Sequence, residues 1–394
     1  MFLSENILSG EKIKNRVRYS THPITQKIIK ILSKIDYDLF VHSDEHYSSV
    51  PIFTIILTIY DANIRFIEES LHSVFNQRYK NTEVVLINNG ADGKVSGLIW
   101  HYFLTHKNSK LICTKEHLYN PSAKLLQDPI PLLWNAGLFC SVGDYVYFLS
   151  YDDFISCDYT EKMVQLFTQN EKCCTAAPSV VLVNELSEIN IDETAHLKNY
   201  SQREKYTNGI LLAQNFMDGG NKIGFPGGLL SIKSDLVLDC GGFDKNNDLS
   251  QLFKFAVCGD SGFDPNAALY WRHHSNQAHK IQRKMGLVYY RDVKEFNGIY
   301  NIKKFHQRVG GSVFADKYEH YINKQMAEHT ISEFWNIYTV SFFWGIRALW
   351  RILFECPLSI QIIAFRRYLK HFPKYFQRSV IARIMHHEIS QDKK

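Results

Sequence analysis

A strand–helix–strand pattern that begins near residue 51 constrains the fold of this chain more than any other feature of its sequence. Residues 52–59 form a continuous apolar, β-branched run, which is typical of a strand buried on both faces. Residues 64–77 repeat apolar side chains on one helical face, and residues 83–87 form a second apolar run. This alternation predicts a βαβ unit, the building block of a mainly parallel sheet.

The same kind of pattern continues downstream. A helix is expected over residues 132–140, and strands are expected over residues 145–149 and 176–183. The polar, irregular residues 185–220 favour an insertion or a loop. The sequence therefore predicts an α/β fold in which a mainly parallel sheet is flanked by helices.

Domain boundaries follow from the changes in character along the chain. We expect residues 1–50 to form an N-terminal extension, because they are polar and mixed in pattern. Residues 51–300 are expected to form the α/β domain. Residues 301–394 are expected to form a helical region rich in basic and aromatic side chains.

Charge and cysteine usage narrow the class of protein. A formal net charge of +5 over 394 residues is too mild to indicate a nucleic-acid partner. The eight cysteines show no C-x-x-C spacing, which favours free thiols in a reducing compartment. Residues 1–19 lack a signal-peptide pattern, and no uncharged apolar run reaches the roughly 18 residues that span a bilayer. We therefore expect a cytoplasmic protein.

Polar side chains gather where the expected strands end. Tyr60 and Asp61 follow the first strand, the sequence Asn88-Asn89-Gly90 follows the second, and Asp152-Asp153 follow a third. Ligands of open α/β sheets bind beyond the carboxyl ends of the strands. Two adjacent carboxylates there need a counter-charge, and Mg²⁺ or Mn²⁺ bridging to a diphosphate would supply one. The alternative is a solvated turn, or an N-cap for the helix that begins near residue 159.

A series of short motifs accompanies these strand ends in a fixed order. In chain order the motifs occupy residues 58–61, 68–81, 88–90, 135–138, 143–149, 150–153, 241–244 and 270–274. Together they resemble the family 2 glycosyltransferases, inverting enzymes with the GT-A fold. The resemblance extends over roughly residues 52–275, so it implies the GT-A form of the α/β fold, with a C-terminal helical extension.

Several site residues are implied by the resemblance. The nucleotide-sugar site would include Tyr60, Asp61, Asn89, Asp92, Asn135, Ser150, Tyr151 and Asp152. The metal, Mg²⁺ or Mn²⁺, would be bound by Asp152, Asp153 and His274. Asp248 falls at the register of the catalytic base, which takes a proton from the acceptor hydroxyl, and Asp244 competes with it for that role. The alternatives are that Asp248 caps a helix and that His274 is an ordinary core or surface histidine.

The substrates are implied in the same way. The donor would be a nucleoside diphosphate sugar, with a UDP-sugar favoured. The acceptor would be a glycan or a lipid-linked glycan in the biosynthesis of a surface polysaccharide such as O-antigen, lipooligosaccharide or capsule. The sugar, the linkage and the oligomeric state are not indicated.

Two departures from the family pattern keep other functions open. Ser150 stands where the family has the first acid of its acidic motif, and Asn89 stands where it has an aspartate. Both changes keep polarity but remove charge. A GT-A binding or scaffold protein without turnover is therefore the alternative. A nucleotidyltransferase is a weaker one, because residues 60–63 are not a glycine-rich, basic phosphate-binding loop.

The C-terminal region has two interpretations. Residues 331–383 interleave aromatic and basic side chains, as in a helix pair that lies at a membrane interface. This interpretation predicts peripheral contact with the cytoplasmic face of the inner membrane. The alternative is a helical subdomain that packs on the catalytic domain or on a second subunit.

Overall fold

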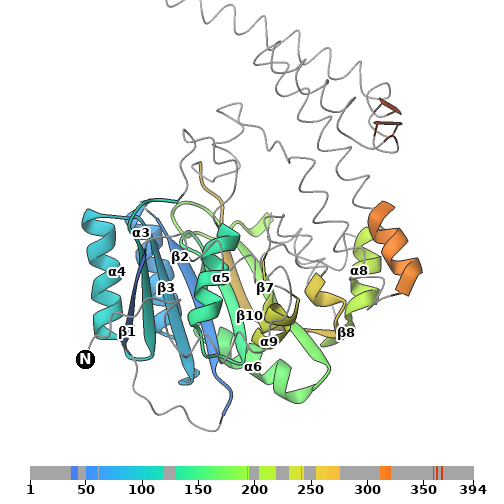
Figure 1. Ribbon diagram of the computed structural model, residues 1–394, viewed down its shortest axis with the longest axis horizontal. Helices are drawn as coiled ribbons and strands as arrows, with labels where there is room; N and C mark the ends of the chain where they lie inside the picture. The colour runs from blue at the N-terminus through green and yellow to red at the C-terminus, as the bar shows by residue number, and fades with distance from the viewer. Residues whose placement is uncertain are drawn as a thin grey trace, which may run out of the picture. The chain divides into compact units, whose positions relative to one another are not determined.

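The computed structural model describes residues 37–42, 50–60, 62–118, 130–192, 194, 204–218, 230–240, 242–243, 254–275 and 311–320, together with 358, 361, 362, 365 and 366. The chain divides into two compact units, Met1–His273 and His274–Lys394. The first unit contains the sheet and its flanking helices (Figure 1).

A single 10-stranded sheet organises the described part of the first unit. Its strands lie in the spatial order β1 (Tyr37–His42), β4 (Ser109–Thr114), β3 (Thr82–Asn89), β2 (Phe53–Ile59), β5 (Tyr145–Ser150), β9 (Ser231–Lys233), β7 (Cys173–Val183), β10 (Asp260–Arg272) and β6 (Phe154–Ile155), with β8 (Tyr206–Asn208) also beside β10.

Six of the described strands run in one direction. β4, β3, β2 and β5 pair in parallel. The short strand β9 is antiparallel to both β5 and β7, so β7 runs in the direction of β5, and β10 is parallel to β7. Only β1, β6, β8 and β9 are antiparallel to their neighbours. The chain therefore has the expected α/β fold, with a mainly parallel sheet flanked by helices, as in the GT-A arrangement.

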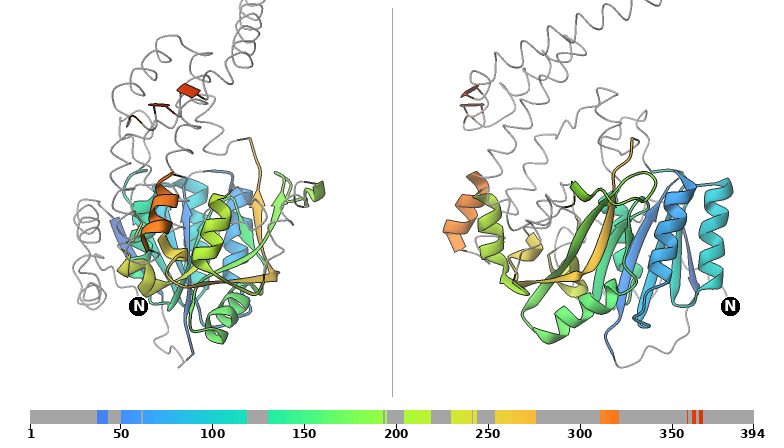
Figure 2. Two further views of the ribbon diagram at one scale, coloured as in Figure 1. Left: turned by 90° about the vertical axis from the view of Figure 1, so that its right-hand side faces the viewer. Right: turned by 180° about the vertical axis from the view of Figure 1, so that it is seen from behind.

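Every residue of β2 is buried, because helices cover both faces of the sheet. Alternate residues of a strand face opposite sides. On one side, Phe53, Ile55, Leu57 and Ile59 join the core formed with α3 (Ile64–Phe75), α4 (Gly93–Thr105) and α6 (Tyr159–Gln169). On the other side lies α5 (Ile130–Cys140), which packs so closely that a Cβ on Gly137 would be 2.6 Å from Ile56 Cγ2. Figure 2 shows these layers from two further sides.

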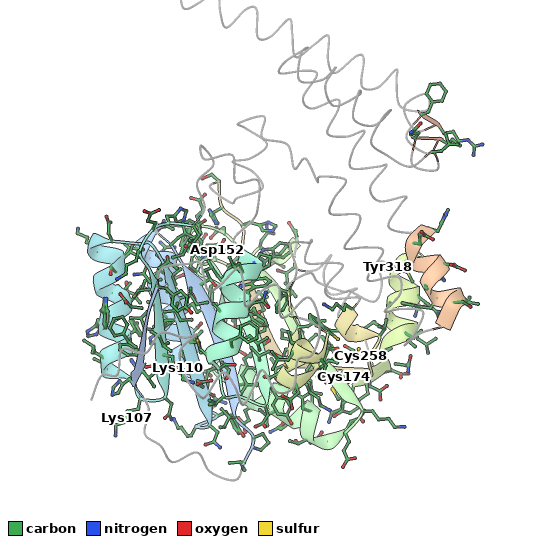
Figure 3. The ribbon with its side chains drawn as sticks, viewed as in Figure 1. Lys107, Lys110, Asp152, Cys174, Cys258 and Tyr318 are labelled. Atoms are coloured by element: carbon green, nitrogen blue, oxygen red, sulfur yellow. The ribbon has the colours of Figure 1, made fainter. Side chains whose placement is uncertain are left out.

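A buried ion pair stabilises the amino-terminal edge of the sheet. Lys110 Nζ on β4 lies 2.7 Å from Glu83 Oε1 on β3. The other oxygen of Glu83 accepts from Thr54 Oγ1 at 2.6 Å and from the Val142 backbone at 2.8 Å. Glu83 thus joins three parallel strands at the edge opposite the acidic pair; Lys110 and Asp152 are labelled at these two edges in Figure 3.

The structure differs from the sequence prediction at two places in the first unit. Residues 37–42, assigned to an N-terminal extension, form the edge strand β1 and pair with β4 along its whole length. Residues 206–217, assigned to an irregular insertion, form β8 and the helix α8 (Gly209–Met217). Both segments owe their structure to tertiary partners, because neither shows a strong periodic pattern.

The second unit begins at His274, whereas the predicted catalytic domain extends to residue 300. Residues 311–320 form a helix in which Phe314, Ala315 and Tyr318 are buried. Most of residues 331–383 lie outside the described residues. Within the part of the chain that the structure describes, no helix has both the length and the apolar character needed to cross a bilayer.

Candidate active site

The strand ends named from the sequence meet at one edge of the sheet. The parallel register places Ile59 beside Asn88, and Thr58 beside Ser150. Since β2, β3 and β5 are parallel neighbours, the residues that follow them share the carboxyl edge. The acidic turn, defined here as residues 150–153, follows β5 at this edge.

Helix α3 holds both flanks of the acidic turn. Ser70 Oγ donates to the Ser150 carbonyl at 3.4 Å, and Ser73 Oγ accepts from the Ile155 backbone at 3.3 Å. Just beyond the C-cap of α3, the buried Gln77 amide donates to the Ser156 carbonyl and accepts from the backbone and hydroxyl of Thr160. Ser70 and Ser73 lie on one face of α3, and Gln77 follows the C-cap of this helix. Together they hold the segment around the acidic turn.

Strand β10 holds the acidic turn from the other side. The backbone N–H of Arg272 donates to Asp153 Oδ1 at 2.9 Å, and Arg272 Nε donates to the Asp152 carbonyl at 2.8 Å. The short strand β6, which follows the turn, pairs antiparallel with β10 through Ile155 and Phe154. The positions of both aspartates are therefore fixed by a strand more than a hundred residues later in the chain.

The nearby positive charge of Arg272 does not fully compensate the two carboxylates. Burial, together with the neighbouring Asp152, raises the pKa of Asp153 well above its usual range, although Arg272 opposes the shift. A raised carboxyl pKa means that the second negative charge is costly without a cation. Two carboxylates combined with phosphate oxygens are a donor set that suits Mg²⁺ or Mn²⁺.

Phosphate oxygens would be needed to complete such a site. Among the described residues, no group of three or more His, Cys, Asp or Glu side chains could hold a metal ion. Asp152 and Asp153 fit the predicted metal only as two ligands of an ion that a diphosphate completes. His274, the third predicted ligand, is buried and is the first residue of the second unit.

Aromatic side chains meet where the acidic turn approaches the end of β2. The hydroxyls of Tyr60 and Tyr151 lie 2.9 Å apart, and their rings meet edge to face with centroids 4.6 Å apart. The ring of His117 also lies near Tyr60, with ring centroids 5.6 Å apart. The structure therefore brings Tyr60 and Tyr151, two residues of the predicted site, into contact.

The end of β3 is a tightly built turn. Asn88 closes it through two hydrogen bonds to the backbone of Ala91. Asn89 is buried, and its Oδ1 accepts from the Leu118 backbone at 3.0 Å. Gly90 has a φ of +68°, and a Cβ there would lie 2.3 Å from the His117 backbone nitrogen. The amide oxygen of Asn89 is thus directed toward the chain that follows β4.

The other predicted nucleotide-site residues differ in their environments. Ser150 and Asp92 are exposed, and Asp92 precedes α4 without a side-chain capping bond to that helix. The amide of Asn135 is used within the chain: it donates to the Phe243 carbonyl at 2.6 Å and accepts from the Phe243 backbone at 2.9 Å. Asn135 therefore positions the residue that immediately precedes Asp244. Asp61, Asp244 and Asp248 lie outside the described residues.

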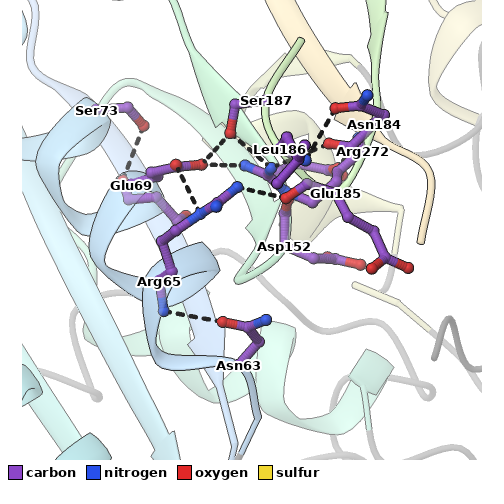
Figure 4. A network of polar contacts seen from close by, with 12 residues as sticks. Asn63, Arg65, Glu69, Ser73, Asp152, Asn184, Glu185, Leu186, Ser187 and Arg272 are labelled. Carbon is purple, nitrogen blue, oxygen red and sulfur yellow. Dashed lines mark hydrogen bonds and ion pairs between the residues drawn. The ribbon is translucent and has the colours of Figure 1, made fainter. Parts of the chain in front are cut away.

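Sequence reasoning missed a network that connects these parts (Figure 4). The guanidinium of Arg272 donates to Glu69 on α3 and, at 2.8 Å, to Ser187 Oγ. Ser187 in turn donates to Glu69 at 2.7 Å. The only signal in the sequence was an arginine next to the apolar residues of a strand, and its partners are distant in sequence.

Two curated proteins of Haemophilus influenzae, each described as an uncharacterized glycosyltransferase, are similar to this chain. One is 31% identical over 127 residues, which make up 32% of this chain and 46% of that protein. The other is 27% identical over 121 residues, 31% of this chain and 34% of that protein. The chain thus matches less than half the length of either relative. No family model matches the chain.

Solved structures of similar arrangement include S. aureus TarS 1–349 in complex with UDP, at 14% identity and a TM-score of 0.47, with 83% of this chain and 91% of that chain covered. They also include the mannosyltransferase PcManGT from Pyrobaculum calidifontis in complex with GDP-Man and Mn²⁺, at 15% identity and a TM-score of 0.43, with 95% and 93% covered. The fold class rests on the strand order and directions described above.

Proposed function

We propose that this chain is a glycosyltransferase that moves a sugar from a nucleoside diphosphate sugar to a hydroxyl of a glycan or lipid-linked glycan, with inversion at the anomeric carbon. One observation carries the proposal: an acidic turn lies at the carboxyl edge of parallel strands, and its Tyr151 contacts Tyr60 at the end of the neighbouring strand. The similarity to two named glycosyltransferases supports the same chemistry. Biosynthesis of a surface polysaccharide is the setting that we propose.

The acidic turn would hold the diphosphate part of the donor. Asp152 and Asp153 would bind Mg²⁺ or Mn²⁺ together with phosphate oxygens. The cation would supply charge stabilisation for the departing nucleoside diphosphate. Tyr60, Asp61, Asn89 and Asp92 would contact the nucleoside, and a UDP-sugar is the favoured donor.

The acceptor side requires a base. Asp248, or Asp244 in its place, would take the proton from the acceptor hydroxyl as its oxygen attacks the anomeric carbon. Asn135 supports this arrangement from a distance, because its amide holds Phe243 next to Asp244. Ser150 is exposed and uncharged. Asp152 would therefore be the main metal ligand, and Asp153 would be the second.

Release of nucleoside diphosphate from a panel of UDP-, GDP- and other nucleotide sugars tests the proposal. We expect one donor to be hydrolysed or transferred when Mn²⁺ or Mg²⁺ is present, and Asp152→Asn to reduce this rate by about 100-fold, as for loss of a charge-stabilising group. Calorimetric titration with each nucleotide provides the second measurement. A chain that binds no nucleotide and turns over no donor would instead be a scaffold protein with a GT-A fold.

A further inference from the structure

A fully buried arginine lies directly behind the acidic turn without a role in the proposed transfer. The side chain of Arg272 has 0% exposure, so it cannot contact a substrate. A buried guanidinium is costly unless each of its donors is satisfied and its charge is paired. Its partners therefore indicate what the buried charge does for the molecule.

The guanidinium of Arg272 joins three separate segments. Its Nε donates to the Asp152 carbonyl at 2.8 Å, in the acidic turn. One terminal nitrogen donates to the Asn184 carbonyl at 3.3 Å and to Ser187 Oγ at 2.8 Å, and the other donates to Glu69 on α3. The planar fork fixes the directions of all these bonds at once, which the single ammonium of a lysine cannot do.

The flat faces of the guanidinium are also covered. Its central carbon lies 4.3 Å from the centroid of the Phe66 ring on α3 and 5.3 Å from that of Phe154 on β6. Both distances are within the range of cation–π attraction. Hydrogen-bond partners and aromatic rings therefore surround the Arg272 guanidinium and restrict its position.

The segment that Ser187 belongs to is itself well ordered. In the turn of residues 184–188, Asn184 Oδ1 accepts from the backbone of Leu186 at 2.9 Å and of Glu188 at 3.0 Å. Arg65 on α3 donates to the Glu185 carbonyl and pairs with Glu69 at 3.4 Å. The 184–188 turn is thus bound to α3 on its own account and presents Ser187 to Arg272 at a fixed place (Figure 4).

Glu69, rather than the aspartate pair, supplies the carboxylate that pairs with the guanidinium. Arg272 reaches the acidic turn through a carbonyl of Asp152 and through its own backbone N–H to Asp153. The geometry points to a positioning residue: we propose that Arg272, held by Glu69 and Ser187, sets the placement of Asp152 and Asp153 for the cation and the diphosphate. This inference rests on the proposed function, because it states what holds the acidic turn in place.

Two variants of the full-length chain test the inference. Glu69→Gln removes the paired charge but keeps the shape, and Arg272→Lys keeps the charge but loses the fork. Partners that orient metal-binding groups typically contribute about 10- to 100-fold to affinity or activity. We expect each variant to weaken the Mn²⁺-dependent binding of UDP, measured by calorimetry, by about tenfold or more. We also expect a lower kcat and a higher Mn²⁺ concentration at half-maximal rate.

Glu83→Gln is the matched control. It also breaks an ion pair of a buried residue, but one that joins β3 to β4 at the amino-terminal edge of the sheet. We expect it to lower the melting temperature while leaving kcat per folded molecule and the Mn²⁺ dependence unchanged. Glu69→Gln, a near-isosteric change on a partly exposed side chain, keeps the test decisive if Arg272→Lys does not fold.

The outcomes separate this inference from the proposed function. Wild-type turnover together with an unchanged Mn²⁺ dependence and UDP affinity in Glu69→Gln would overturn the positioning role alone. A wild-type chain that binds UDP and Mn²⁺ without turnover would overturn the transferase proposal, and the binding data would still decide the role of Arg272. Absence of any Mn²⁺-dependent binding in the wild-type chain would overturn both.

Discussion

Asp248 is the side chain whose replacement addresses the proposed chemistry most directly. Asp248→Asn removes the proton acceptor but keeps size and polarity, so we expect loss of transfer by about 100-fold or more with donor affinity nearly unchanged. Rates of nucleoside diphosphate release with acceptor, and calorimetric Kd values for the donor, measure the two effects. Asp244→Asn is the matched variant, and undiminished turnover in Asp248→Asn would transfer the base role to Asp244.

Gly90 illustrates a position that only glycine can occupy. Its φ of +68° and the approach of the His117 backbone leave no room for a Cβ. We expect Gly90→Ala to lower the free energy of unfolding by about 2 kcal/mol or more and to weaken nucleotide binding, because the turn after β3 must move.

Gly97→Ala in α4 is the control for that substitution, since nothing lies within 4 Å of a Cβ at Gly97. In a helix interior, a change from glycine to alanine is expected to raise the free energy of unfolding by about 0.5–1 kcal/mol. Chemical denaturation of both variants gives the comparison. Equal stabilities for the two would contradict the steric reasoning.

The reactivity of each cysteine depends on whether its own thiol is buried. Burial raises the pKa of Cys173 to about 12 and, together with Asp38, raises that of Cys113 to about 11, whereas Cys157 is exposed. The thiolate is the reactive form, so Cys173 and Cys113 stay protonated, and react slowly, at any pH below their pKa values.

We expect iodoacetamide at pH 8 to label Cys157 well before Cys113 and Cys173. Peptide mapping by mass spectrometry resolves the individual sites, and the differences should vanish in denaturant. Early labelling of Cys173 in the native protein would show that β7 opens readily.

Among the secondary-structure elements, α3 does more than its sequence pattern indicates. Its apolar face was predicted from periodicity and packs on the core, with Ile67, Leu71 and Val74 buried. Its polar face holds the acidic turn and Arg272 through Glu69, Ser70 and Ser73, and Gln77 adds a contact just beyond the C-cap. The same helix therefore connects core packing to the geometry of the site.

Gln77→Ala tests the contact that follows the C-cap of α3. The substitution removes hydrogen bonds to Ser156 and Thr160 and leaves buried backbone groups unpaired, so we expect a loss of about 2 kcal/mol or more in unfolding free energy. Gln165→Ala, at an exposed position of α6, should change stability by less than about 0.5 kcal/mol. Urea unfolding of both variants is the measurement, and an unchanged stability of Gln77→Ala would argue against this role of Gln77.

Strands and helices with strong periodicity could be predicted, and those that depend on distant partners could not. The runs at residues 52–59 and 145–149 correspond to β2 and β5 within one residue at each end. In contrast, β9 has three residues and exists because it lies between β5 and β7. β10 contains Asp264, Pro265 and Asn266, which favour a turn, and the sheet accommodates them as an irregularity in the pairing.

The site residues also divide into those that a local sequence pattern reveals and those that depend on distant partners. Asp152 and Asp153 could be found because adjacent acids after a strand form a local pattern. Arg272 and Glu69 could not, because their contact joins residues 203 positions apart and each is an ordinary charged residue in its own segment. The network forms because the fold brings these residues together, and no local sequence pattern encodes that proximity.

Across the whole chain, membrane association is the prediction that concerns the C-terminal residues. Residues 366–378 carry a cluster of basic side chains, and each one near an anionic surface contributes about 1 kcal/mol. We expect the full-length protein to sediment with vesicles that contain anionic phospholipid at low salt, and less so with neutral vesicles. Replacing Arg366, Arg367 and Lys370 by Gln should weaken this binding by about 100-fold. A protein that remains in the supernatant with anionic vesicles at low salt would favour a subunit or packing role.

The order of strands along the chain has a consequence for synthesis on the ribosome. The acidic turn emerges with β5, but the strand that carries Arg272 is the last of the described strands to be made. A nascent chain that stops before residue 272 therefore has its acidic turn without the backbone and guanidinium donors that orient it. Truncated products of translation would lack an ordered site, so the catalytic geometry becomes available only after the whole sheet has been synthesised.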